Sequence, residues 1–494
     1  MARLHVSGRY PYLGRPPTYS TPHRARTDVQ RILPADRLAT GTPVAKHRGV
    51  TPSWREIPGP PPTPPKGNLA DIVAAGGLHT FQLDLHERYG PVARFELRDT
   101  RVVSIADPEL LAVTSRINRR PEELFEFLSP LFEAGNLQTI PEQEHLPWRR
   151  LLASALGNHR SHQAHFHAFT QITLEVADRW AGAAGEVALQ EELSELSLRL
   201  ICEFALGSEL ESSAAAHRTS TAFRDLLEEH LGRQYGLPSA VAEQERKARA
   251  AEALTHLRQT ITRILEARRA GPDRPQADLV SMLADSDWDP ARIRDTALVV
   301  VMAGYHTSGV AVSWALHLLA GHPEIARRVR DELDRVLGDR PAPTYPELRC
   351  LDYLERVVKE AMRRYPPGPY AARELTEDLA LGDYLIPAGT TLMYPIWAIH
   401  LNPAHWPDPQ RFDPDRFTPA AAQGRPKFAF IPFGFGPRSC EGAALAMVEI
   451  KLMLAVLLKR FEFQPMPGHV VTPVDRFVLW ARDDIKMTLT PRGS

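Results

Sequence analysis

The spacing of apolar residues along the chain predicts a mainly helical protein. In residues 161–205 and 240–270, apolar side chains recur at intervals of three and four between charged ones, as from Leu193 to Phe204. This is the period of an amphipathic helix. Patterns typical of strands occur around residues 92–105 and 379–392, where glycine and proline mark the turns. We therefore expect a mainly α fold with a small β portion.

One segment, Ala297 to Leu319, is apolar almost throughout and long enough to cross a bilayer, which takes about 20 residues. The polar run Gly304-Tyr305-His306-Thr307-Ser308 lies at its centre, however, and such groups are costly in lipid. Helices that are apolar on all sides also form the centre of large soluble domains. We predict a long buried central helix rather than a membrane span, with the polar run as a functional hint.

The first 66 residues differ from the rest of the chain. They carry eleven Lys or Arg against three acidic residues, and 13 of the 44 prolines, which favour stiff, extended backbone. The prolines would break the amphipathic helix of a mitochondrial transit peptide. We predict a disordered extension over residues 1–57, or an overlong reading frame, and a single domain over residues 58–494. That remainder is acidic, so nucleic acid is not an expected partner.

Three cysteines in 494 residues, namely Cys202, Cys350 and Cys440, are too few and too scattered for a disulfide framework. A reducing compartment, the cytoplasm, is therefore predicted. Cys440 ends a loop with the sequence Phe-Gly-Phe-Gly-Pro-Arg-Ser-Cys, just before a helix predicted over residues 443–459. Backbone N–H groups at a helix N-terminus stabilise a thiolate. A lone thiolate suits a metal whose other ligands come from a cofactor, and the alternative is a buried structural cysteine.

The whole loop resembles the haem-ligand signature of the cytochrome P-450 superfamily. The pattern Phe-x-x-Gly-x-Arg/His-x-Cys-x-Gly is matched at Phe433, Gly436, Arg438, Cys440 and Gly442. Three further blocks resemble that family in the expected order: Glu360 with Arg363, one helical turn apart, Arg416 in Pro-Asp-Arg-Phe, and residues 303–308. The resemblance implies a helical haem domain with a long distal helix, a structural Glu360–Arg363–Arg416 triad and monooxygenase activity.

The resemblance also implies a role for individual residues around haem b (iron protoporphyrin IX). Cys440 is expected to be the proximal iron ligand, with Phe433 shielding its sulfur and Gly442 following it. Arg438, Arg373 and the pair His145/Arg149 match positions that hold the haem propionates. Because Glu142 and Glu144 lie just before His145, an exposed polar residue is the alternative there.

On the distal side, Gly304 is expected to leave room above the iron, and Thr307 to hydrogen-bond O₂ or a proton-donating water. The hydroxyl of Thr307 can also bond a carbonyl one turn back. His306 stands where the family has Asp or Glu. Three alternatives follow. The imidazole can still pass protons, the proton relay can run through water and the substrate's own hydroxyls, or monooxygenation can be impaired. Glu441 beside the cysteine is also unusual, and its charge should make the iron harder to reduce.

The remaining expectations concern substrate and partners. Candidate substrate contacts are mostly apolar and fall where the family's substrate regions lie: Phe125, Phe127, Val300, Ala303, Tyr305 and Tyr370. They favour a hydrophobic small molecule as substrate, such as a terpenoid, fatty acyl or polyketide. The alternative for each residue is that it belongs to the hydrophobic core. Only 54 residues follow Cys440, too few for a redox module. We therefore expect electrons from a separate ferredoxin or flavodoxin with its reductase, docking on positive charge near Arg149, Arg150, Arg425, Lys427 and Arg438.

Three hypotheses follow. The first is a soluble, bacterial haem-thiolate monooxygenase. The second is a peroxide-driven peroxygenase or haem-dependent isomerase, favoured only by His306. The third is a non-catalytic haem-binding sensor, which would keep Cys440 and lose turnover.

Overall fold

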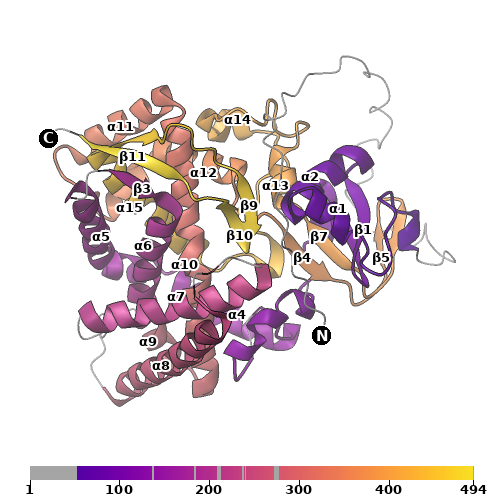
Figure 1. Ribbon diagram of the computed structural model, residues 1–494, viewed down its shortest axis with the longest axis horizontal. Coiled ribbons are helices and arrows are strands. Elements are labelled where there is room, and N and C mark those ends of the chain that lie inside the picture. Colours follow the sequence, from indigo (N-terminus) through magenta and orange to yellow (C-terminus); the bar gives the residue numbers. More distant parts are fainter. Residues whose placement is uncertain are drawn as a thin grey trace. The chain divides into compact units, whose positions relative to one another are not determined.

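A computed structural model describes residues 53–492 except 136–137, 183–184, 208–212, 236–238, 240 and 272–277. Nearly all of the predicted extension over residues 1–57 lies outside the described residues, and its boundary stays a prediction. The described residues form one compact unit (Figure 1).

Helices dominate this unit, as predicted. They are α1 (Leu69–Ala74), α2 (Leu78–Tyr89), α3 (Pro108–Thr114), α4 (Glu142–Leu156), α5 (His159–Gly182), α6 (Leu189–Leu206), α7 (Ser213–Tyr235), α8 (Glu243–Ala270), α9 (Leu279–Ala284), α10 (Pro290–Ala320), α11 (Pro323–Leu337), α12 (Asp352–Arg364), α13 (Ile396–Leu401), α14 (Pro419–Ala422) and α15 (Ala443–Arg460). Short 3₁₀ turns include η4 (Glu122–Leu124), η5 (Glu126–Leu131), η7 (Pro414–Phe417) and η9 (Gly436–Arg438).

The strands form small sheets. The largest has the order β1-β2-β7-β4, with β2 parallel to β7 and the other pairs antiparallel; its strands are β1 (Val92–Leu97), β2 (Thr100–Ile105), β7 (Thr391–Tyr394) and β4 (Ala371–Glu374). A second sheet joins β3 (Glu186–Ala188), β11 (Lys486–Pro491) and β8 (Phe461–Pro465). Two hairpins pair β5 (Leu379–Leu381) with β6 (Tyr384–Ile386) and β9 (Pro473–Arg476) with β10 (Val478–Ala481). Figure 1 shows β1, β4 and β7 beside α1 and α2, whereas β3 and β11 lie among the helices.

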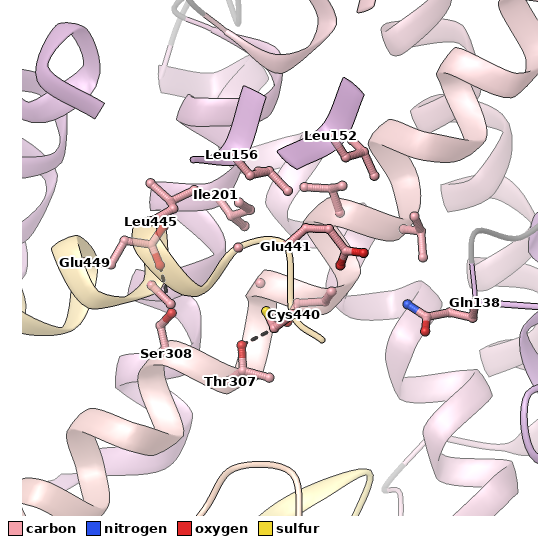
Figure 2. A pocket seen from close by; sticks show the side chains of 16 residues that line it. Gln138, Leu152, Leu156, Ile201, Thr307, Ser308, Cys440, Glu441, Leu445 and Glu449 are labelled. Atoms are coloured by element: carbon pink, nitrogen blue, oxygen red, sulfur yellow. Dashed lines mark hydrogen bonds between the residues drawn. The ribbon is translucent and has the colours of Figure 1, made fainter. Parts of the chain in front are cut away.

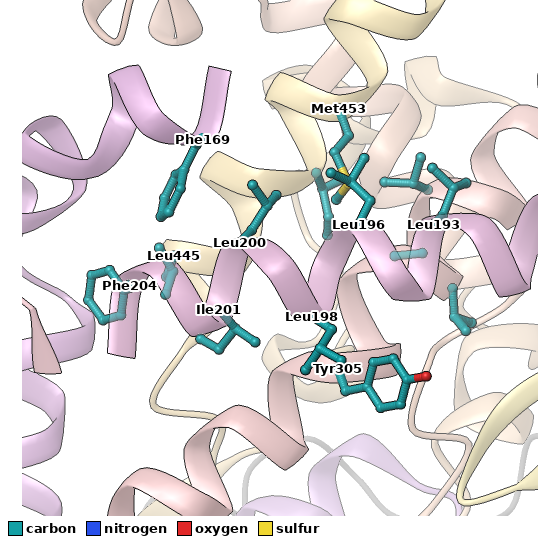
Figure 3. Close-up of a cluster of buried hydrophobic side chains, with 14 of the residues drawn as sticks. Phe169, Leu193, Leu196, Leu198, Leu200, Ile201, Phe204, Tyr305, Leu445 and Met453 are labelled. Atoms are coloured by element: carbon teal, nitrogen blue, oxygen red, sulfur yellow. The ribbon is translucent and has the colours of Figure 1, made fainter. Parts of the chain in front are cut away.

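The central helix α10 is long and apolar enough to cross a membrane, but 78% of its most apolar stretch is buried inside the fold. It is a core helix, as its polar run predicted. Helix α6 packs closely along it, with Leu196, Leu200 and Ile201 in the same apolar cluster as Tyr305 (Figure 3). The contact needs glycine, because a Cβ on Gly309 would lie 2.4 Å from the carbonyl oxygen of Leu193.

The helical pattern over residues 161–205 is divided between α5 and α6, with β3 between them. Gly182 and Gly185 flank the break, and glycine weakens a helix. The start of α6 is capped from far away in the sequence: the N–H groups of Gln190 and Glu191 donate to the Asp484 carboxylate at 2.8 and 3.0 Å. The local spacing of apolar residues does not predict such a cap.

Candidate functional site

The loop before α15 meets α10 at a cavity with about 610 Å³ free of protein atoms, open solvent included. Helix α10 contributes Val299, Val300, Ala303, Gly304, Thr307 and Ser308, and the loop and α15 contribute Cys440, Glu441, Gly442, Leu445, Ala446 and Glu449. Leu152, Leu156, Ile201 and Gln138 complete the lining. The wall is apolar apart from a few side chains that can do chemistry (Figure 2). This matches the usual make-up of a ligand site.

Glycines shape the loop that presents Cys440. Gly436 has φ +68°, and a Cβ there would lie 2.2 Å from the Ser115 carbonyl oxygen. The N–H of Cys440 donates to the Phe433 carbonyl at 2.8 Å, which closes the turn just before α15. A Cβ on Gly442 would lie 3.9 Å from the Cys440 sulfur. The pattern predicted this thiol at a helix start, and the structure places it there, facing the cavity.

Without a bound metal, the surroundings of Cys440 disfavour its thiolate form. Burial, assisted by the charge of Glu441, raises the pKa of the thiol to about 11, while the Gly442 N–H, Arg149 and Arg120 act in the opposite direction. The helix N-terminus alone therefore leaves a protonated thiol at neutral pH. A bound metal cation deprotonates a thiol that coordinates it.

Two buried arginines, Arg373 and Arg438, and the partly buried Arg120 gather near this loop. Arg438 donates to the carbonyl oxygens of Asn118 and Ile140, both at 2.8 Å, and Arg373 donates to Ala372 at 2.7 Å and Phe435 at 3.3 Å. Arg120 donates to the carbonyl of Arg438 at 3.2 Å.

Desolvation, together with repulsion from Arg373 and Arg438, lowers the pKa of Arg120 to about 9. Burial likewise lowers the pKa of Arg373 and of Arg438 to about 10. Such a cluster fits a ligand with more than one negative charge. The two propionates of a haem meet that requirement. Sequence reasoning missed Arg120, whose signal was only its place in an Arg-Arg pair.

His145 and Arg149 differ in burial and in hydrogen-bond partners. The imidazole of His145 is 1% exposed, so the exposed alternative is wrong. Burial, reinforced by neighbouring arginines, lowers its pKa to about 3, and its Nδ1 is buried without a hydrogen-bond partner. Arg149 instead bonds the Cys440 loop, through Ser439 and the carboxylate of Glu441. Propionate binding by either residue stays a prediction.

Phe433 is half-buried against the main apolar cluster. Its side chain lines a hollow next to the cysteine loop, together with Glu355, Lys359 and Met447. Shielding of the Cys440 sulfur by Phe433 stays a prediction.

On α10, the hydroxyl of Thr307 donates to the Ala303 carbonyl at 3.0 Å and lines the cavity (Figure 2). Gly304 lines it too, but a Cβ there would lie 2.7 Å from Ile201 Cγ1 of α6. The Ser197 hydroxyl also donates to the Gly304 carbonyl at 2.7 Å. Gly304 is therefore required by the crossing of α6 and α10, in addition to any need for room above an iron.

His306 points away from this lining. Its ring stacks on Tyr305, with centroids 3.9 Å apart, and meets the edge of Trp480 on β10 at 5.1 Å. Burial lowers the pKa of His306 to about 3, so the imidazole is neutral at neutral pH. This environment therefore does not give His306 a pKa near neutrality, which would suit proton transfer.

A different acid reaches the cavity. Glu449 on α15 is buried, and its Oε2 accepts a 2.8 Å hydrogen bond from the Ser308 hydroxyl (Figure 2). Burial raises its pKa to about 8, against the lowering effect of that hydrogen bond. Glu449 therefore keeps its proton at neutral pH. Sequence reasoning missed it, although a glutamate inside the apolar stretch of α15 was a signal.

The structure brings the predicted triad together. Arg363 donates to both oxygens of Glu360 at 2.7 and 2.8 Å, and Arg416 Nε lies 3.6 Å from Glu360 Oε1. The N–H of Asp413 also donates to this carboxylate, at 2.9 Å. Glu360 and Arg363 are fully buried, so the pair ties α12 to the segment around η7.

The predicted substrate contacts divide into two groups. Val300 and Ala303 line the cavity. Tyr305 faces another hollow, along α6 and α7, and burial raises its pKa. Outside the described lining, Tyr370 donates to Asp475 at 2.6 Å, Phe127 meets Phe477 edge-on at 6.2 Å, and Phe125 stacks under the Arg120 guanidinium at 5.3 Å.

Comparisons with known proteins agree with this geometry. The family model described as cytochrome P-450 matches residues 57–489. Mouse cytochrome P-450 20A1 is 27% identical over 94% of this chain and 96% of its own length. A cyclooctat-9-en-7-ol 5-monooxygenase of Streptomyces melanosporofaciens is 36% identical over 43% of this chain and 47% of its own. The crystal structure of a cytochrome P-450DA haem domain superposes with a TM-score of 0.79, covering 88% of this chain and 98% of that one, at 21% identity.

Proposed function

Because the chain belongs to the cytochrome P-450 family and is a monooxygenase of that family, we propose that it inserts one atom of O₂ into a hydrophobic small molecule. The reaction takes place in the cavity that Thr307 and Cys440 share. This juxtaposition carries the proposal: a thiol delivered by a glycine-shaped loop and a hydroxyl on the core helix line one largely apolar space.

The residues present fit a haem, and we propose haem b. Cys440 would hold the iron, and Arg120, Arg373 and Arg438 would hold the two propionates. Of the described cysteines, Cys440 lines this cavity, whereas Cys202 and Cys350 are not among its lining residues and so do not offer a thiol for covalent attachment there. When bound, the haem supplies an iron that binds O₂ and accepts electrons.

The protein's own part in the chemistry is to exclude water and to supply protons. Val299, Val300 and Leu445 keep the lining apolar. Glu449 holds a proton at its carboxyl group and shares a hydrogen bond with Ser308, next to Thr307. We propose that Glu449, by way of Ser308, replaces the acid missing at position 306, since a carboxyl group with a pKa near the working pH is an effective proton donor.

The apolar lining supports a terpenoid, fatty acyl or polyketide-like substrate. A protein similar over part of the chain is named for the oxygenation of cyclooctat-9-en-7-ol, which favours the terpenoid class. The three unpaired cysteines support a cytoplasmic enzyme.

Electrons would come from a ferredoxin or flavodoxin with its reductase. The hollow formed by Lys359, Phe433 and Met447 adjoins the outer side of the Cys440 loop. Positive charge at the exposed Lys427 and Arg150 supports docking of an acidic donor there.

The test is isotope labelling. The purified enzyme, a surrogate ferredoxin and reductase, and a panel of terpenoids and fatty acids are incubated under ¹⁸O₂ and analysed by mass spectrometry. We expect one ¹⁸O atom in the product, dependent on reductant. Label only from H₂¹⁸O₂, or an isomer with no added oxygen, would instead establish the peroxygenase or isomerase alternative. Haem binding without any product across the panel would favour a sensor.

A further inference from the structure

A second hollow is lined mainly by residues of α5, α6 and α7, together with Tyr305 of α10. It has about 1830 Å³ free of protein atoms, open solvent included. Among the described residues, it shares no lining residue with the cavity at Cys440. This α6–α7 hollow is therefore separate from the site proposed for the haem.

Tyr305, Cys202 and Ser220 form the buried floor of the α6–α7 hollow, at 7%, 3% and 3% exposed. The Tyr305 ring stacks on His306, but its hydroxyl makes no hydrogen bond to another described residue. Figure 3 shows this hydroxyl directed away from Leu198. A buried hydroxyl without a partner costs free energy, so the site favours a ligand that bonds this oxygen.

Two ion pairs at the wall of the hollow are complete. Arg179 of α5 donates to Glu192 of α6 at 2.5 and 3.2 Å, and Arg199 of α6 donates to Glu175 of α5 at 2.5 Å. Each pair joins the same two helices and cancels its own charge. A ligand therefore meets the charges that lie outside these pairs.

Those remaining charges are mainly negative. Glu191, Glu195 and Glu203 are spaced by multiples of four along α6, so they share one face of the helix. Arg224 of α7 lies 3.9 Å from Glu195, which is longer than a direct hydrogen bond. Burial raises the pKa of Tyr305, and the charges of Glu195 and Glu191 raise it further while Arg224 opposes them. The floor of the hollow therefore suits a cation.

Two of these carboxylates are sheltered from solvent. The side chains of Glu195 and Glu203 are 32% and 18% exposed, so salt screens them less than carboxylates on an open surface. The Nδ1 atom of His165 lies 3.3 Å from Glu203, and this imidazole carries a charge only when protonated. Both carboxylates thus keep negative charge available to a ligand.

The lining also indicates the kind of cation. In the described part of the chain, no group of three His, Cys, Asp or Glu side chains is placed to hold a metal ion. Ile172, Cys202 and Ala216 add apolar surface to the hollow. A carbon chain that carries ammonium groups matches both features, because each N–H can donate to a carboxylate or to the phenol oxygen.

We propose that the α6–α7 hollow binds an aliphatic diamine, with one ammonium group between Tyr305 and Glu195 and the other at Glu203. The two glutamates are eight residues apart, or about 12 Å along the helix, which their side chains and a short diamine span together. The occupant would contact α10 at Tyr305, beside Gly304 of the Cys440 cavity. This site adds to the proposed function and does not depend on it.

The experiment titrates the full-length haem protein with putrescine (1,4-diaminobutane) in a calorimeter. The protein is held as the ferrous carbon monoxide complex, so that the amine cannot ligate the iron. The matched neutral probe is 1,4-butanediol, which has the same chain and no charge. The variants are Tyr305→Phe, which keeps the ring, Glu195→Gln and Glu203→Gln. The control Glu245→Gln removes a carboxylate on α8 that pairs with Arg249.

We expect one putrescine per chain with a Kd of about 1 mM or tighter, and no saturable binding of 1,4-butanediol. Tyr305→Phe, Glu195→Gln and Glu203→Gln should each weaken putrescine by about tenfold, since each removes a hydrogen bond to a charged group. Glu245→Gln should stay within about twofold of wild type, because surface charges far from the ligand are screened. Circular dichroism and thermal melting establish that each variant folds. Should Tyr305→Phe fail to fold, the two variants on α6 carry the test.

The proposal is overturned if wild type shows no saturable binding of putrescine up to about 20 mM, or if 1,4-butanediol binds equally well. It is also overturned if Tyr305→Phe or Glu195→Gln binds putrescine as tightly as Glu245→Gln, which would indicate attraction to the surface charge alone. Failure of the proposed function is recognised separately, because wild-type protein would then show no red-shifted Soret band with carbon monoxide, whatever its affinity for putrescine.

Discussion

The hydroxyl of Ser308 on α10 donates a 2.8 Å hydrogen bond to the carboxyl group of Glu449 on α15. The two residues are 141 positions apart and both are buried. They line the cavity that also holds Thr307 and Cys440. The bond therefore places an acid at the site from the helix that follows the cysteine.

Glu449→Gln should lower O₂-dependent turnover by about tenfold or more, because general acid catalysis contributes roughly 10²–10⁴-fold. The amide preserves shape and hydrogen bonding but cannot release a proton. His306→Asn serves as the matched variant, and it should stay within about threefold of wild type because the imidazole stacks on Tyr305 and Trp480. The rate of product formation at saturating substrate, O₂ and NADPH measures both. If His306→Asn instead lost more turnover than Glu449→Gln, the proton relay would be assigned to His306.

Glu449 should also make stability depend on pH. Its pKa rises from 4.5 in the unfolded chain to about 8 in the fold, so between these values the folded state holds a proton that the unfolded state has released. The free energy of unfolding should fall by roughly 1.4 kcal/mol per pH unit over that window and change no further above it. The difference between wild type and Glu449→Gln, from urea denaturation at pH 6 and 7.5, isolates this contribution. A constant difference would contradict it.

Gly304→Ala should destabilise the fold by about 1–3 kcal/mol, because the new methyl group would overpack against Ile201. The control is Gly232→Ala in α7, where a Cβ meets nothing within 4 Å. That change should stabilise by up to about 1 kcal/mol through helix propensity. Ile201→Ala should offset part of the cost in the double variant, measured by chemical denaturation. Additive effects would mean that α6 and α10 do not meet as described.

Arg120→Gln should have opposite effects with and without cofactor. Removing the partly buried guanidinium of Arg120 should stabilise the apoprotein, since desolvation and repulsion from Arg373 and Arg438 lower its pKa to about 9. The holoprotein should release haem about tenfold faster, because a propionate loses a charge-assisted partner. Apoprotein denaturation and haem transfer to apomyoglobin measure the two effects. Unchanged haem transfer would exclude Arg120 from the propionate site.

The elements and residues that could be predicted from the sequence are those whose signal is local. The apolar run interrupted at residues 304–308 predicted the buried α10, and the glycine-rich loop predicted a thiol at the start of α15. The pair Glu360 and Arg363 needed only helical spacing. Each of these rests on residues within a few turns of one another.

The rest depends on contacts between distant segments. Asp484 caps α6, Glu449 meets Ser308, and Arg149 meets Glu441, across separations of 293, 141 and 292 residues respectively. Residue type and spacing alone do not encode such pairings. The same applies to His306, whose ring contacts Trp480 of β10. Desolvation lowers its pKa to about 3, so the imidazole is neutral at neutral pH.

The central claim, that Cys440 holds a haem iron as thiolate, is tested most directly by a carbon monoxide difference spectrum of dithionite-reduced protein, wild type beside Cys440→Ala. We predict a Soret band shifted far to the red in wild type and absent from the variant. A wild-type spectrum without that band, or the same band in both proteins, would contradict the assignment of Cys440 and the proposed chemistry with it.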